Sequence, residues 1–137
     1  MRFILTSVFL SLGFGLFAQA DGEIVTNYEA LPIDVFTSLQ EETNAVDVSF
    51  FPPSTKSISF NGQNAKLFLD FVQREAPTTL QGEPMGFIMF LVDGEMIVSG
   101  NIYMWDEDQG AFEFTYDNKK CYQSISAQGV GFMMNNK

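Results

Sequence analysis

The sequence predicts an α+β fold in which one main helix packs on an antiparallel β-meander of about four to five strands. Three observations predict it. Residues 65–76 have the apolar spacing of an amphipathic helix. Asp93-Gly94 separates two long apolar segments, and apolar and polar side chains alternate over 112–116. The chain has 137 residues, which is the length of a single domain.

Residues 1–20 have the order of a secretory signal peptide. Arg2 precedes an uncharged, mainly apolar run over 3–17, and small residues follow in 18–20 at the positions that a signal peptidase reads. A membrane-spanning helix needs about 20 apolar residues, and this run is shorter, so we prefer a cleaved signal peptide to an uncleaved anchor. The expected mature protein is a single α+β domain over 21–137. We expect it to be exported, periplasmic or extracellular, with no membrane span after signal removal.

The segments before the main helix carry weaker patterns. Residues 31–39 have apolar residues at ambiguous helical spacing after Leu31-Pro32, and proline is tolerated in a first helical turn. Apolar and polar residues alternate over 46–50, which predicts a half-buried strand that Pro52-Pro53 ends. Residues 57–60 add a short extended piece.

The main helix is predicted over 65–76. The preceding Asn61-Gly62 is typical of a turn. Pro77 ends the helix because the residue before a proline is disfavoured in the α conformation. The apolar side of the helix consists of Ala65, Phe68, Leu69, Phe71 and Val72.

A β-hairpin is predicted around Asp93-Gly94, between segments 85–92 and 95–105. Both turn residues readily take the positive φ angles that a two-residue type I′ turn requires. A regular ladder then follows from this turn. The expected cross-strand pairs are Leu91–Met96, Met89–Val98 and Phe87–Gly100.

Two more strands complete the predicted meander. The first covers the alternating segment 112–116, and Asp117-Asn118-Lys119 turns the chain into a returning strand over 121–126. The final segment, 127–134, fits either a short helix or a last strand.

Both faces of the first hairpin carry apolar side chains, whereas an antiparallel sheet with a solvated side normally has polar residues there. We expect one face to pack under helix 65–76: Met85, Phe87, Met89, Leu91, Met96, Val98, Ile102 and Met104. The other face is the candidate interaction face: Ile88, Phe90, Ile97, Tyr103 and Trp105. Either segment 24–39 or the C-terminal piece covers this face, or it binds a second copy, a partner protein or an apolar ligand.

The composition excludes several classes of function. With 17 acidic and 7 basic residues the formal charge is −10, which argues against binding to nucleic acid phosphates. The chain has no histidine, so histidine general bases and histidine metal sites are excluded. The acidic segment 106–110 begins like a calcium loop but lacks the distant glutamate that such a loop uses, and we interpret it as a solvated turn. We expect no catalytic residue, no metal and no cofactor.

Cys121 is the single cysteine, so an internal disulfide is excluded. The neighbouring Lys119 and Lys120 favour the thiolate, but no histidine is present to act as its base. We therefore interpret Cys121 as a packed, unreactive side chain, with an intermolecular disulfide as the alternative.

These observations favour a secreted or periplasmic, non-enzymatic binding module that acts through an aromatic sheet face with an acidic rim. Its expected partner is a basic protein or a second copy of the chain. The first alternative is a carrier of an apolar small molecule, with a pocket between helix 65–76 and the sheet. The second alternative is a carboxylate-dependent hydrolase, although no pair among the many carboxylates is singled out by the sequence.

Overall fold

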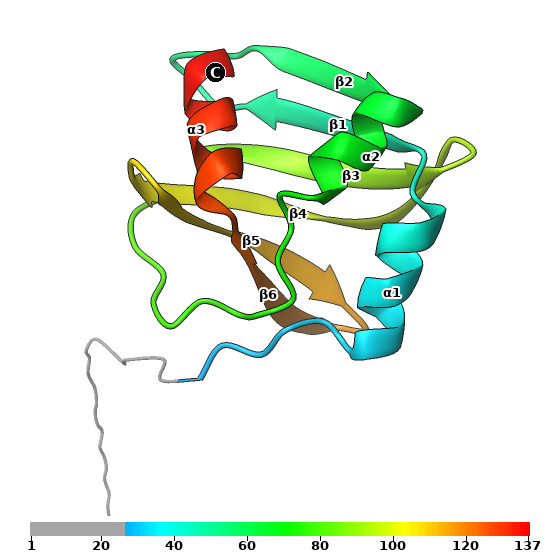
Figure 1. Cartoon of the computed structure of the whole chain (residues 1–137). Coiled ribbons are helices and arrows are strands. Elements are labelled where there is room, and N and C mark those ends of the chain that lie inside the picture. The colour runs from blue at the N-terminus through cyan, green and yellow to red at the C-terminus, as the bar shows by residue number, and fades with distance from the viewer. Residues whose placement is uncertain (1–26) are drawn as a thin grey trace, which may run out of the picture.

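A computed structural model describes residues 27–137, so the predicted signal peptide lies outside the described residues. Helices and strands follow in the order α1 (Ile33–Glu42), β1 (Ala45–Phe50), β2 (Ser57–Asn61), α2 (Gln63–Leu69), β3 (Gly86–Val92), β4 (Glu95–Asp106), β5 (Gln109–Tyr116), β6 (Lys119–Ile125) and α3 (Ala127–Asn136). The strands form one antiparallel sheet in the order β2-β1-β3-β4-β5-β6. The three helices lie on the same face of this sheet (Figure 1).

The predicted α+β class is confirmed, but the described chain has six strands and three helices instead of four to five strands and one main helix. The consecutive antiparallel strands β3 to β6 are the predicted meander. The additional strand is β2, which was expected only as a short extended piece. It pairs with β1 at the edge of the sheet, so that β1 lies between β2 and β3.

The main helix is shorter than its apolar pattern predicts. α2 ends at Leu69, and the chain then leaves the helical path to pair with the edge of β6. The Gln73 amide donates to the Ser124 carbonyl oxygen at 2.9 Å, and the Ser124 amide donates to the Glu75 carbonyl oxygen at 2.8 Å. These tertiary hydrogen bonds replace the helical bonds that the local pattern favours.

The final segment is a helix and not a strand. The Ser126 side chain accepts a hydrogen bond from the Gly129 amide at 3.0 Å, which is the N-cap contact that starts α3. α3 then buries Val130 and Met133 against the sheet.

The centre of the core is a cluster of aromatic rings between the sheet and the helices. Phe112 and Phe114 of β5 stack with ring centroids 5.7 Å apart, and Phe90 of β3 meets Phe114 edge-on at 5.6 Å. Phe68 of α2 lies 6.4 Å from Phe112 and joins the helical layer to the sheet. All four side chains are fully buried. Such pairs add specific geometry to the burial of apolar area.

A bulge in the first hairpin reverses the predicted faces of β3. The Asp93-Gly94 turn has the expected positive φ angles, 51° and 87°, and Leu91 pairs with Met96 as predicted. The ladder then shifts, so that Phe90 and not Met89 pairs with Val98. Ile97 is the extra residue, and a shift of one position moves a whole strand's side chains to the opposite face. The predicted pairs Met89–Val98 and Phe87–Gly100 are therefore wrong; the pairs are Met89–Ser99 and Phe87–Asn101.

The close approach of β4 to β5 leads to a stability prediction at Gly100. A Cβ atom there would overlap the Glu113 carbonyl oxygen, whereas a Cβ at Gly131 in α3 would meet nothing within 4 Å. We expect Gly100→Ala to lower the free energy of unfolding by about 2 kcal/mol or more. Gly131→Ala should raise it by about 1 kcal/mol through helix propensity. Urea denaturation measures both, and equal effects of the two changes would contradict the strand contact.

Candidate functional site

The predicted interaction face does not exist as one surface. Ile88 and Phe90 each have 0% exposed area and belong to the core under the helices, because of the bulge in the first hairpin. Ile97 projects at that bulge, beside α1. Tyr103 lies on the face of the sheet away from the helices, and Trp105 lies at a second irregularity of β4, where its Nε1 donates to Gln109 Oε1 at 3.1 Å.

Segment 24–39, which was expected as a possible cover for the candidate interaction face, takes another path in its described part. Its helical part, α1, buries Phe36 and Leu39 in the core on the helical face. The preceding residues follow β6, where the Tyr122 amide donates to the Glu29 carbonyl oxygen at 2.7 Å. Trp105 keeps partial exposure in a shallow polar notch with Thr78 and Thr79.

A mainly apolar recess lies in a groove between α2 and α3. Its volume is about 440 Å³, and its floor reaches edge strand β2. Four phenylalanine rings converge there from three elements and the turn after α2. The ring centroids are 5.0 Å apart for Phe60–Phe68, 5.4 Å for Phe68–Phe71, 5.5 Å for Phe71–Phe132 and 5.8 Å for Phe60–Phe132. We call this recess, with Leu67, Asn64, Asp70 and Gln128 at its rim, the phenylalanine groove.

The rim of the phenylalanine groove is partly apolar as well. Leu67 has 54% of its area exposed, although it lies on a helix that buries its neighbour Phe68 completely. Asn64 and Gln128 add side-chain amides, and Asp70 adds one carboxylate. An apolar floor with a few polar groups at the rim is the usual composition of a small-molecule site.

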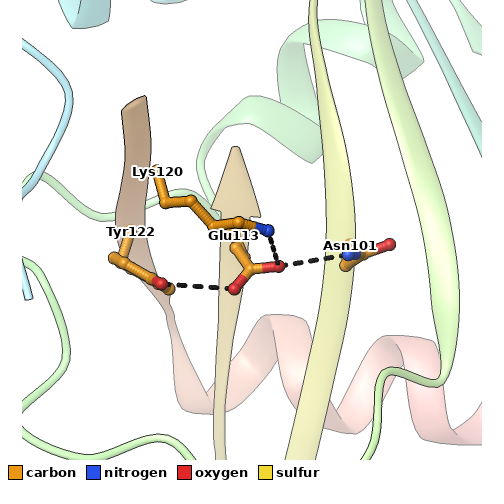
Figure 2. Close-up of polar contacts among 4 residues, drawn as sticks. All are labelled: Asn101, Glu113, Lys120 and Tyr122. Atoms are coloured by element: carbon orange, nitrogen blue, oxygen red, sulfur yellow. Dashed lines mark hydrogen bonds and ion pairs between the residues drawn. The ribbon is translucent and has the colours of Figure 1, made fainter. Parts of the chain in front are cut away.

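The face of the sheet away from the helices has a different character, because its centre is a carboxylate. Glu113 of β5 has 8% of its area exposed and lies between Asn101 of β4 and Tyr122 of β6 in one row across the sheet. Figure 2 shows its contacts: Oε1 accepts from Asn101 Nδ2 at 3.1 Å and from Lys120 Nζ at 3.4 Å, and Oε2 accepts from the Tyr122 hydroxyl at 3.2 Å. We call these four residues the Glu113 cluster.

Both oxygens of Glu113 are thus occupied by donors from its own chain, so the Glu113 cluster is a satisfied polar network. Burial, followed by the charge of Glu113 and the hydrogen bond to it, raises the pKa of Tyr122 to about 12. Burial and the charge of Glu113 raise the pKa of Tyr103 as well. The two phenols therefore keep their protons at neutral pH, and Tyr122 serves as a donor to the carboxylate.

Cys121 lies in the core, and the acidic segment 106–110 lies at the turn between β4 and β5. Cys121 is buried and pairs with Phe114, and burial raises the pKa of its thiol although the charge of Lys119 opposes this. Residues 106–110 span the turn between β4 and β5, where Asp106 Oδ1 accepts from the Glu107 amide at 2.7 Å. Within residues 27–137, no three histidine, cysteine, aspartate or glutamate side chains come together as metal ligands.

No protein-family model matches the chain, and neither a curated protein nor a solved structure matches it. In the part of the chain that the structure describes, every helix is too short or too polar to cross a membrane. Function is therefore inferred from the geometry above. The phenylalanine groove is the candidate functional site, because it combines exposed apolar area with a defined shape.

Titration of the phenols tests the Glu113 cluster. Tyr122 should ionise at about pH 12 in the folded protein, above the ordinary 10.0. Because the folded-state pKa is raised, protonated Tyr122 stabilises the fold below pH 10, and this contribution is lost as the pH rises toward 12. In Glu113→Gln the pKa should fall while remaining above the ordinary value, since burial is the larger cause. Ultraviolet absorbance of the phenolate measures this, and an unchanged titration in the variant would contradict the contact.

Proposed function

We propose that this protein is a non-enzymatic binding module whose phenylalanine groove takes an apolar small molecule. The observation that carries the proposal is the convergence of Phe60, Phe68, Phe71 and Phe132 on a recess of about 440 Å³ that opens to solvent. Pockets for small ligands have volumes of about 300–1,000 Å³ and mainly apolar walls. The exported setting indicated by residues 1–20 remains part of the proposal.

The polar groups at the rim narrow the chemistry of the ligand. Asp70 is the charged side chain among the lining residues, and the whole chain has a formal charge of −10. This field disfavours an anionic head group and attracts a cationic one. The amides of Asn64 and Gln128 offer both donors and acceptors. The groove therefore suits a ligand with an aromatic or aliphatic body and a neutral or cationic polar end.

This proposal is a form of the carrier alternative, which expected the pocket between helix 65–76 and the sheet, whereas the groove lies between α2 and α3. The hypothesis of an aromatic sheet face has less support, since Ile88 and Phe90 are buried. A carboxylate-dependent hydrolase also has less support, because the buried carboxylate of Glu113 already accepts three hydrogen bonds from its own chain. The phenylalanine groove, with Leu67 at its rim, is the site that the structure supports better than either of these two.

Two lysine substitutions at equally exposed residues test the groove. Leu67 at its rim is 54% exposed, and Met96, in the first hairpin away from the groove, is 53% exposed. We expect Leu67→Lys to weaken binding of a neutral, environment-sensitive apolar dye about tenfold, because it removes about 1.4 kcal/mol of apolar contact. Met96→Lys should leave the dye affinity unchanged. Fluorescence titration measures both affinities.

Native mass spectrometry of the purified wild-type protein provides the second readout. A co-purifying small molecule that is retained in Met96→Lys and lost in Leu67→Lys would support the groove. Equal loss of dye affinity in both variants would place binding elsewhere. Tight binding of a fatty-acid anion, in preference to the neutral dye, would contradict the inferred head-group chemistry.

A further inference from the structure

The chain protects one edge of its sheet and not the other. Irregular segments cover the outer side of β6 through backbone hydrogen bonds: Tyr122 to Glu29, Gln73 to Ser124, and Ser124 to Glu75. Along β2, at the opposite edge, residues 27–137 supply no such partner, and the edge lies open at the top of Figure 1. Ser57–Asn61 also contains no charged residue and no proline. Proteins usually protect an open sheet edge with a covering segment, a charged side chain or a proline.

Hydrogen bonds at both ends of β2 show which backbone groups point outward. The Phe50 amide donates to the Lys56 carbonyl oxygen at 2.8 Å, and the Gly62 amide donates to the Asn44 carbonyl oxygen at 3.0 Å. Residues of an antiparallel pair alternate between bonding the neighbour and pointing away from it. The even-numbered residues of β2 therefore bond β1. The residues that direct N–H and C=O groups outward are Ser57, Ser59 and Asn61.

We propose that this edge is the interface of a homodimer, in which β2 pairs antiparallel with β2 of a second copy about a twofold axis at Ser59. In this register Ser59 exchanges hydrogen bonds with Ser59 of the second copy, and Ser57 does so with Asn61. Every outward backbone group of the strand is then paired, and the two sheets become one continuous sheet. The contact is isologous, as in most homodimers.

The side chains of β2 are complementary to themselves in the same register. On the helical face, Ile58 of one copy meets Phe60 of the other, and both are only half-buried in the single chain. On the opposite face, Ser57 meets Asn61. No charged side chain of the strand opposes another, although each chain carries a formal charge of −10. A strand that is its own partner in hydrogen bonding, polarity and charge favours a second copy over an unrelated peptide.

Three substitutions at Ser59 test the interface in the full chain. The Ser59 hydroxyl donates to Asp47 Oδ1 at 2.7 Å, and all three changes remove this bond. Ser59→Ala is therefore the matched control and should remain dimeric. Ser59→Pro removes the two central N–H donors of the dimer without breaking a backbone hydrogen bond to β1, and Ser59→Lys places like charges directly opposite. We expect each of these two changes to weaken association about tenfold or more.

Sedimentation equilibrium over a concentration series measures the association, at an ionic strength that screens repulsion between the acidic chains. Circular dichroism of each variant checks the fold. A wild-type protein that stays monomeric throughout, or a dimer that persists in both Ser59→Pro and Ser59→Lys, overturns the proposal.

Amide hydrogen exchange gives a readout that other dimers would not share. In the monomer the Ile58 and Phe60 amides should be protected by β1, while those of Ser57, Ser59 and Asn61 exchange fast. In the dimer all five should be protected. A dimer in which the three outward amides still exchange fast would use another surface. Dye binding to the phenylalanine groove is not needed for this result, so the two proposals fail separately.

Discussion

The structure depends on one extra residue in β4. Side chains alternate along a strand, so a regular ladder from the Asp93-Gly94 turn would place Met89 opposite Val98. The bulge at Ile97 places Phe90 there instead, in the core that the helices cover. This choice brings Phe90 against Phe112 and Phe114 in the central ring cluster, which Phe68 joins to α2. The same bulge places Met89 and Phe87 on the other face of the sheet, beside Ser99 and Asn101.

Local signals were sufficient for most of the elements. The Asp-Gly turn, the alternation over 112–116 and the apolar spacing over 31–39 each match an observed element, because short-range sterics and burial determine them. The bulge has no such signal, since Met96, Ile97 and Val98 are all apolar and fit either face. α2 ends at Leu69, and the residues after it pair with β6, which is distant in sequence. The local apolar pattern therefore does not predict this end of the helix.

The sequence predicted the candidate site only in part, because the site also depends on contacts between segments that are distant in sequence. A pocket between helix 65–76 and the sheet was expected. The phenylalanine groove lies between α2 and α3 instead, and two of its rings belong to segment 65–76. The other two, Phe60 and Phe132, come from a strand and a helix whose neighbours are known only from the fold. Glu113 did have a signal: it is the ionisable residue between Phe112 and Phe114, whose alternation places it on the opposite face. Its partners Asn101 and Tyr122 could be identified only from the register of β4 and β6 against β5.

The groove and the β2 edge meet at Phe60, whose ring lies on the groove floor while its strand forms the open edge. In the proposed dimer Ile58 of the second copy lies against this ring, so the groove changes its surroundings when two copies associate. A ligand that prefers the groove in one state must shift the association equilibrium by the same factor by which association changes its affinity. The side chain of Phe60 is thus the contact through which ligand binding and self-association would be linked, without any movement of the core beneath it.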